Sequence, residues 1–164
     1  MAREVRAALA LLAVALGGAA LAATPATPRT HSYLRIDGVL GASDDPAHLG
    51  WFDVASWSPA GPTPDGRAAA RLRIVGAPPP DLAAAVATRK TLHEALLQDV
   101  RASDGRLVRN VSFWRFVITG LEQARAPARS YAVTLQATHV VCDDYGPPSA
   151  NGGPCASLKA TQQP

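Results

Sequence analysis

The feature that most constrains the fold is a series of short apolar runs, each bounded by glycine, proline or aspartate. From Ala68 to Val75 the residues alternate, with Leu72 and Ile74 on one side and Arg71 and Arg73 on the other. A period of two residues is typical of a β-strand that is buried on one face. The other runs are Tyr33–Leu40, Trp51–Trp57, Thr91–Arg101, Arg106–Gly120 and Tyr131–Cys142. The sequence therefore predicts about six strands.

The fourth and fifth predicted strands are joined by the segment Ser103–Gly105, which contains Asp-Gly. Asp-Gly between two apolar runs is a strong signal for a β-hairpin. In the fifth strand, alternation places Val111 and Phe113 on one face and Phe116 and Ile118 on the other. Because both faces are largely apolar, we expect this strand to be buried on two sides.

One helix and two loops interrupt the strands. The segment Asp81–Thr88 is rich in alanine, follows a run of prolines and begins with aspartate, which suits the positive end of a helix. Gly41–Gly50 is polar and reads as a loop, and Ser58–Gly66 contains three prolines and two glycines, which predicts a long irregular loop. The predicted fold class is mainly β, an antiparallel β-barrel or sandwich with one lateral α-helix.

The first residues have the pattern of an export signal. Met1–Arg6 carries two arginines, Ala7–Leu21 carries no charge, and the run ends in a small-x-small pattern at Ala22. We expect a signal peptide cleaved between Ala22 and Ala23, and a secreted or periplasmic protein. A membrane anchor is the alternative, but the uncharged run of about 15 residues is shorter than the roughly 20 that a spanning helix needs. We therefore expect no stable membrane span after cleavage.

The remaining chain divides into three parts by composition. Residues 23–31 form a Pro/Thr-rich segment that we expect to be a flexible linker. Residues 32–145 contain all the strand-like runs and form the predicted barrel domain, and residues 146–164 form a Gly/Pro-rich tail.

Two cysteines lie in the last quarter of the chain, Cys142 and Cys155. Outside the cytoplasm such a pair tends to oxidise, so we predict a disulfide between them. The alternative is a metal site that pairs Cys142 with His139, but a fourth ligand is not evident nearby.

Charge and motifs exclude several functions. Lys and Arg number 16 against 13 Asp and Glu, a formal net charge of +3, and the basic residues form no stripe of the kind that tracks nucleic-acid phosphates. The sequence has no glycine-rich phosphate loop, nucleophile elbow or paired metal motif. We therefore expect no catalytic residues, no cofactor, no metal and no nucleic-acid partner.

One alternative is an enzyme built around His48. A histidine near Asp45 and Asp53 could perform acid–base chemistry. The simpler interpretation is that these side chains stabilise a loop by hydrogen bonds to one another and to the backbone.

A second alternative is a sugar-binding face made of Trp51, Trp57 and Trp114. In a β domain, tryptophans more often serve as core or subunit-interface anchors.

The segment Tyr33–Trp57 is more specific than its strand pattern. It resembles the opening of the Hcp family, the haemolysin-coregulated proteins that form the tube of type VI secretion systems. The family pattern joins a strand that ends in glycine, a Gly-x-Ser, an aspartate, a histidine and a second strand with an Asp-Val-x-Ser core. The matching residues are Gly38, Gly41, Ser43, Asp45, His48, Asp53, Val54, Ser56 and Trp57. The resemblance continues in the order of elements to about Tyr145.

The resemblance implies a β-barrel protomer flanked by a helix and without catalytic activity. It also implies homo-oligomeric rings, with a hexamer as the family default, that stack head to tail. In that family the rings act as a tube component or as a carrier of secreted effector proteins. The expected partners are therefore other copies of this chain and secreted effectors.

The predicted signal peptide favours a different function for the same fold. Tube assembly in the Hcp family takes place in the cytoplasm, so an exported copy would be removed from it. Ala42 also stands where the family commonly has glutamate. The alternative function is an exported periplasmic or extracellular binding module that no longer forms tubes.

Overall fold

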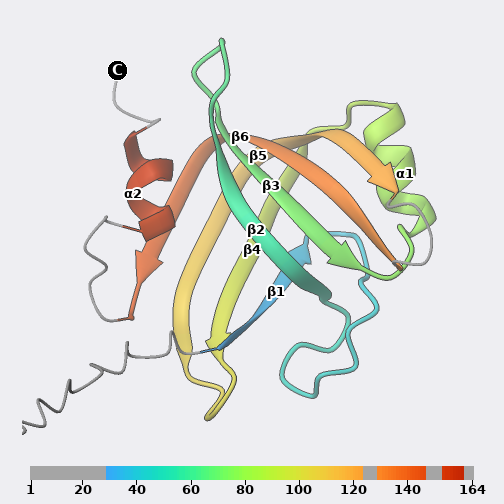
Figure 1. Cartoon of the computed structure of the whole chain (residues 1–164). Helices are drawn as coiled ribbons and strands as arrows, with labels where there is room; N and C mark the ends of the chain where they lie inside the picture. Colours follow the sequence, from blue (N-terminus) through green and yellow to red (C-terminus); the bar gives the residue numbers. More distant parts are fainter. Residues whose placement is uncertain (1–28, 124–128, 147–152, 161–164) are drawn as a thin grey trace, which may run out of the picture.

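A computed structural model describes residues 29–123, 129–146 and 153–160 of the chain. Six antiparallel strands close into one barrel in the order β1-β2-β3-β6-β5-β4 (Figure 1). The strands are β1 (Thr30–Ile36), β2 (Phe52–Pro62), β3 (Ala68–Val75), β4 (Leu92–Arg101), β5 (Leu107–Gln123) and β6 (Ser130–Asp144), and the helices are α1 (Pro80–Ala87) and α2 (Gly153–Ala160). The predicted antiparallel β fold is confirmed, in the form of a closed barrel.

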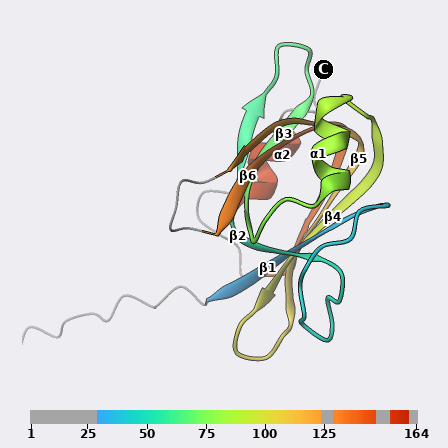
Figure 2. The ribbon, with the colours of Figure 1, turned by 90° about the vertical axis from the view of Figure 1, so that its right-hand side faces the viewer.

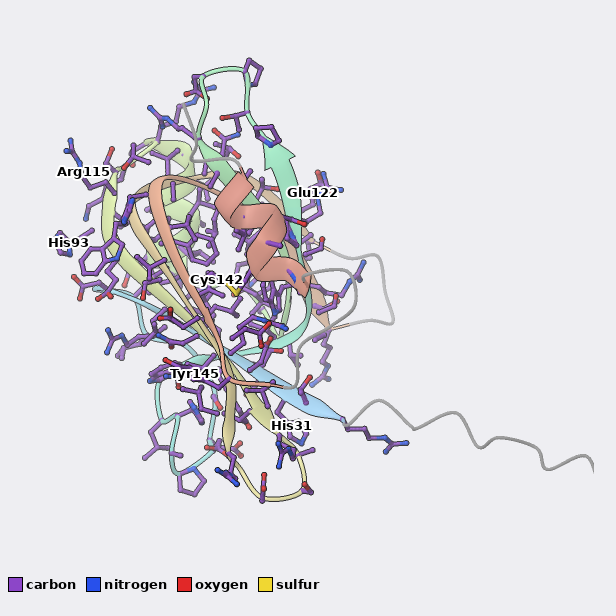
Figure 3. All side chains as sticks on the ribbon, turned by 90° about the vertical axis from the view of Figure 1, so that its left-hand side faces the viewer. His31, His93, Arg115, Glu122, Cys142 and Tyr145 are labelled. Atoms are coloured by element: carbon purple, nitrogen blue, oxygen red, sulfur yellow. A yellow bond between two sulfur atoms is a disulfide. The ribbon has the colours of Figure 1, made fainter. Side chains whose placement is uncertain are left out.

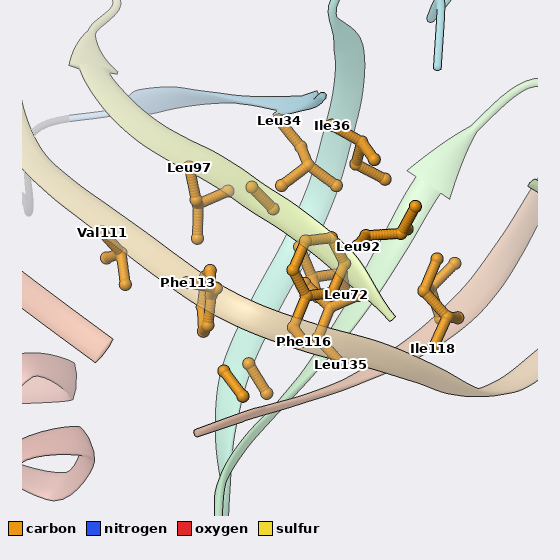
Figure 4. Packing of buried hydrophobic residues seen from close by; sticks show 14 of the residues in the cluster. Leu34, Ile36, Leu72, Leu92, Leu97, Val111, Phe113, Phe116, Ile118 and Leu135 are labelled. Atoms are coloured by element: carbon orange, nitrogen blue, oxygen red, sulfur yellow. The ribbon is translucent and has the colours of Figure 1, made fainter. Parts of the chain in front are cut away.

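The interior of the barrel is a single hydrophobic core. In β3, Leu72 and Ile74 are fully buried while Arg71 and Arg73 are exposed, as the alternation of the sequence predicts. Buried side chains from all six strands belong to this core. Figure 4 shows part of this packing. The largest fully buried side chains are Tyr131, Phe113, Phe116, Leu34, Ile36, Leu72, Ile74, Leu82, Leu97, Ile118, Leu135 and Leu158.

The prediction that β5 is buried on two sides is wrong. Phe113 and Phe116 are both fully buried in the core, although they are three positions apart and strict alternation would place them on opposite faces. Between them Arg115 has a left-handed φ of 48°, and the Thr138 hydroxyl of β6 donates to the carbonyl of Trp114. This irregularity reverses the alternation within the strand. The apolar residues that strict alternation assigned to two faces therefore share one, and the other face points outward.

The prediction of a long irregular loop over Ser58–Gly66 is also wrong. β2 continues to Pro62 and pairs with β3 from Ser58 opposite Arg71 to Pro62 opposite Ala68. Only the four residues Thr63–Gly66 form the turn, and the Gly66 N–H donates to the Thr63 carbonyl. The register shifts between Pro59 and Gly61. This shift accommodates the prolines of β2, because proline has no backbone N–H to donate to a neighbouring strand. The resulting hairpin projects beyond the barrel at the top of Figure 1.

Two short helices close the ends of the barrel. Leu82 and Ala85 of α1, and Cys155 and Leu158 of α2, belong to the core cluster. Strands enclose the core on all sides, so helix side chains can reach it only through an open end. The helices lie on opposite sides of the barrel, α1 in front in Figure 2 and α2 in front in Figure 3. The helix predicted near Asp81 is confirmed, whereas α2 lies in the segment that we predicted to be a Gly/Pro-rich tail.

The predicted disulfide is confirmed. Cys142 near the end of β6 is bonded to Cys155 of α2, and both residues are buried (Figure 3).

No helix in the described part of the chain is long and apolar enough to cross a membrane. The predicted signal peptide and its cleavage position lie outside the described residues and stay predictions.

Tyr131 offers a test of the core. Its side chain is 1% exposed, and its hydroxyl has no hydrogen-bond partner among the described residues. A buried hydroxyl without a partner is unfavourable, so Tyr131→Phe should keep or increase the free energy of unfolding at pH 7, by up to about 1 kcal/mol. Urea denaturation measures this change, and a loss of more than about 1 kcal/mol would show that the hydroxyl has a partner.

A comparison of wild type with Tyr131→Phe should also show how the free energy of unfolding depends on pH. Burial raises the pKa of Tyr131 from 10.0 to about 12. As the pH rises above 10, this tyrosine ionises in the unfolded chain while it stays neutral in the folded protein. Wild type should therefore lose stability between pH 10 and 12, by about 1 kcal/mol per pH unit from this group, and Tyr131→Phe should lose less over the same range. Equal losses in both proteins would contradict the assignment.

Candidate functional site

The segment that joins β1 to β2 forms a compact loop, and its backbone is held by its own hydrogen bonds. The Gly41 N–H donates to the Gly50 carbonyl over 2.7 Å, and the Ser43 N–H donates to the Trp51 carbonyl over 2.8 Å. A Cβ atom on Gly41 would overlap the backbone carbonyl of Trp51, so this position requires glycine. Gly38 adopts a left-handed φ of 76° at the start of the loop. Two glycines of the predicted motif thus have a steric role.

His48 attaches this loop to the outside of the barrel. Tyr33 of β1 and Gln98 of β4 are directly opposite each other, and His48 covers this pair. Its ring stacks on Tyr33 with centroids 3.9 Å apart and meets the Trp51 ring edge-on at 5.0 Å. Its Nδ1 lies 3.0 Å from Asp45 Oδ1, and its Nε2 lies 3.2 Å from Gln98 Oε1. The sequence motif contains His48 and Asp45, but Gln98 is 50 residues away and no sequence pattern indicated it.

This arrangement favours a structural role for His48. The side chain is 10% exposed, and each ring nitrogen already faces an oxygen. The hydrogen bond from His48 lowers the pKa of Asp45, so its carboxylate is a weaker base than an ordinary aspartate. A general base needs an accessible atom and a pKa near the working pH. The geometry therefore supports the loop-stabilising interpretation over the enzyme alternative.

Asp53 does not join His48. It lies on β2 opposite Tyr33, half-exposed on the outer face. Burial raises the pKa of the Tyr33 hydroxyl, and the charges of Asp45, Asp53 and Asp44 raise it further. Asp45, whose carboxylate accepts a hydrogen bond from the Tyr33 hydroxyl, and Asp53, on the neighbouring strand, therefore both lie close to Tyr33.

The end of the motif leads into the barrel. The register of β2 shifts between Val54 and Ser56. As a result Val54 and Trp57 both contribute to the core, and Ser56 is exposed. The Trp57 Nε1–H donates to both carboxylate oxygens of Asp99, over 3.0 and 3.2 Å.

Asp99 is the centre of a buried polar cluster that sequence reasoning missed. It is 4% exposed and accepts hydrogen bonds from Ser32 Oγ over 2.6 Å and from Arg109 over 2.8 Å, besides those from Trp57. Arg109 also pairs with Asp144 over 3.2 Å, and its guanidinium lies over the Trp57 ring. The cluster fills the end of the barrel at which β6 finishes. The available signal was an aspartate two residues after the inward-facing Leu97, in phase with the core.

The three tryptophans do not form one surface. Trp57 is engaged inside the end of the barrel, whereas Trp51 lies on the loop beside Arg35. Trp114 lies on β5, with its ring 5.4 Å from that of His93. A single sugar-binding face made of the three is therefore wrong.

The two residues of the alternative metal site, His139 and Cys142, lie on different faces of β6. His139 is exposed opposite Trp114, and Cys142 is buried and bonded to Cys155. Among the described residues, no three or more metal-ligating side chains come together.

Comparison with known proteins identifies the fold. No protein-family model and no curated protein sequence matches the chain. The structure of Hcp1 from Salmonella typhimurium is similar, with a TM-score of 0.62 and 20% identity, over 71% of this chain and 88% of that chain. Secreted protein Hcp3 from Pseudomonas aeruginosa has a TM-score of 0.55 and 14% identity, over 73% and 100%. A type VI secretion system effector from Yersinia pestis has a TM-score of 0.52 and 15% identity, over 71% and 99%.

At these identities the similarity establishes the fold. The chain has the fold of the Hcp proteins, with a divergent sequence. The resemblance that the segment Tyr33–Trp57 indicated is confirmed at this level. The roles of the individual motif residues in assembly stay predictions.

Proposed function

We propose that this protein is a non-enzymatic, ring-forming structural protein of the Hcp type, which acts as a tube component or effector carrier in type VI secretion. The observation that carries the proposal is the extent of the match, since the alignment to Hcp1 spans 88% of that chain. A match that extends over nearly a whole protomer includes the surfaces through which such a protomer could associate. Fold alone does not establish function, so the surface of this chain has to support the role as well.

The β1–β2 loop presents a suitable surface. Leu40 is 80% exposed and Leu49 is 68% exposed, the two highest values among the large apolar residues of the described chain. The hydrogen bonds within the loop and the packing of His48 hold these leucines away from the barrel. A rigid loop keeps these apolar side chains in water. Covering them with a partner removes apolar surface from water and so lowers the free energy of the complex. A second copy of this chain is the partner that the proposal assigns to them.

The packing of His48 supports the non-enzymatic part of the proposal. The His48 and Asp45 pair was the strongest candidate for acid–base chemistry in the sequence, and the ring nitrogens of His48 face Asp45 in the loop and Gln98 on β4. The loop therefore serves as a rigid contact surface in this proposal.

The oligomeric state tests the proposal. Residues 23–164, exported to the periplasm and oxidised, should form rings that are visible by negative-stain microscopy and that sediment well above the monomer. The double variant Leu40→Asp/Leu49→Asp should remain folded and lose the rings. Leu107→Asp, at an exposed apolar position on β5, is the control and should keep them. A wild-type protein that stays monomeric at all micromolar concentrations would contradict the proposal.

An exported binding module of the same fold is the second candidate. The Cys142–Cys155 disulfide favours it, because structural disulfides are typical of proteins outside the cytoplasm. It predicts a monomer or dimer in the same sedimentation experiment, and therefore the opposite result.

A further inference from the structure

Helix α2 is short, and few of its side chains reach the core. It has eight residues, and an isolated helix of this length is not stable in water. Its main contacts are with β6 and β2. The described side chains that it buries in the core are Cys155 and Leu158. These few contacts oppose the conformational entropy that is lost when the helix is ordered.

Helix α1 closes the other end under different conditions. It also buries two side chains, Leu82 and Ala85. However, the chain leads directly from β3 into α1 and from α1 into β4, so the barrel holds this helix on both sides. Of the described barrel strands, none follows α2. The bond between Cys142 and Cys155 supplies a second covalent connection between α2 and the barrel.

We propose that α2 is a lid whose closure over this end of the barrel depends on oxidation of Cys142 and Cys155. In the reduced chain the two thiols are separate and α2 detaches from the barrel. On oxidation the two thiols lose two electrons and two protons to a protein disulfide, which becomes a dithiol, through a mixed-disulfide intermediate. The new S–S bond then keeps α2 closed.

The barrel has the means to remain folded while the lid is open. Ser32, Trp57 and Arg109 all bond to Asp99 at this end, and none of these groups belongs to α2. This cluster links β1, β2, β4 and β5, and the strand pairing of the closed barrel does not involve the helix. Opening would expose Cys142, which is fully buried when the lid is closed. The lid is therefore a separate unit of low stability on a stable barrel.

The lid relates the disulfide to the predicted signal peptide. Cytoplasmic thiols are kept reduced, whereas secreted and periplasmic proteins meet an oxidising environment. The end of the barrel that α2 covers would thus be open before export and closed after it. The closed lid also protects the bond, since Cys142 and Cys155 are 0% and 5% exposed and a reductant reaches them only after local opening. This inference does not depend on ring formation.

Hydrogen exchange with mass spectrometry tests the lid. Residues 23–164 are compared in three forms: oxidised wild type, wild type reduced by a phosphine under partial denaturation and returned to buffer, and the double variant Cys142→Ala/Cys155→Ala. In the oxidised protein the amides of 153–160 should exchange slowly. In the other two forms they should exchange at least about tenfold faster, while the peptides of β1 to β5 and of α1 change by less than about twofold.

Two results would overturn the lid. Protection of α2 that stays within about twofold of the oxidised value in both bridge-free forms would show that the helix holds without the bond. Equal loss of protection in α2 and in the strands would show a general cross-link of the whole fold. Oxidised Leu158→Ala is the matched variant, and it should lose less α2 protection than the double cysteine variant because the bond is still present.

Discussion

Asp99→Ala is expected to lower the free energy of unfolding by about 3–5 kcal/mol. The carboxylate is 4% exposed and is the acceptor for Ser32, Trp57 and Arg109. Its removal leaves the Trp57 and Ser32 donors without this acceptor, and among the described residues it leaves the largely buried Arg109 guanidinium with Asp144 alone as a charged partner. An unpaired charge in the interior is far more costly than the loss of an ion pair at the surface. Equilibrium denaturation in urea measures the change.

The control for this prediction is Asp104→Ala. Asp104 also pairs with an arginine, Arg101, over 3.1 Å, but the Arg101 and Asp104 side chains are 35% and 39% exposed. The expected loss is therefore at most about 1 kcal/mol. If the two substitutions cost the same, the Asp99 cluster is not a support of the barrel end.

The second large effect is expected for Phe116→Ala, a loss of about 3–5 kcal/mol in the free energy of unfolding. Phe116 is fully buried and belongs to the same core cluster as Phe113. Removing most of the ring leaves a cavity that the surrounding strands can fill only in part. Urea denaturation again provides the measurement.

Trp114→Ala is the matched comparison, and it should cost only about 1 kcal/mol. Uninterrupted alternation along β5 would place Trp114 and Phe116 on the same face, whereas the irregularity at Arg115 turns Trp114 outward. A cost for Trp114→Ala as large as for Phe116→Ala would show that β5 is buried on two sides after all.

Several elements follow from the sequence because their causes are local. Leu72 and Ile74 alternate with Arg71 and Arg73, and β3 has the buried and exposed faces that this pattern predicts. The Asp-Gly turn near Gly105 joins β4 and β5 as a hairpin, closed by the Arg101 N–H donating to the Arg106 carbonyl. Turn chemistry and alternation depend on a few neighbouring residues, so the sequence alone predicts the elements that they form.

The errors arise where a distant strand decides the local structure. Ser58–Gly66 has the composition of a loop, but pairing with β3 keeps it extended as far as Pro62. The phase of β5 changes at Arg115, which has no partner between the pairs of Trp114 and Phe116 with β6, and the Thr138 hydroxyl of β6 bonds to the β5 backbone there. α2 has little helical signal of its own, and its Cys155 and Leu158 side chains are buried in the core of the barrel. None of these influences is visible in the segment itself.

The candidate site divides in the same way. The motif in Tyr33–Trp57 identified Gly41, Asp45 and His48 as residues of one loop, and the structure places them together. The sequence did not indicate that His48 reaches Gln98, or that Trp57 turns inward to Asp99. Both partners lie on β4, which becomes a neighbour of β1 only when the barrel closes.

The amino-acid sequence alone determined the β character of this chain, one of its helices, its disulfide pairing and its resemblance to the Hcp proteins. These depend on side-chain period, turn residues and spacing, all of which are properties of short segments. Only the tertiary structure decided which polar side chains meet at the end of the barrel, and that α2 closes that end. Closure brings Ser32, Trp57, Asp99 and Arg109 from four strands into one water-poor space, where a buried charge is stable only if its partners are in place.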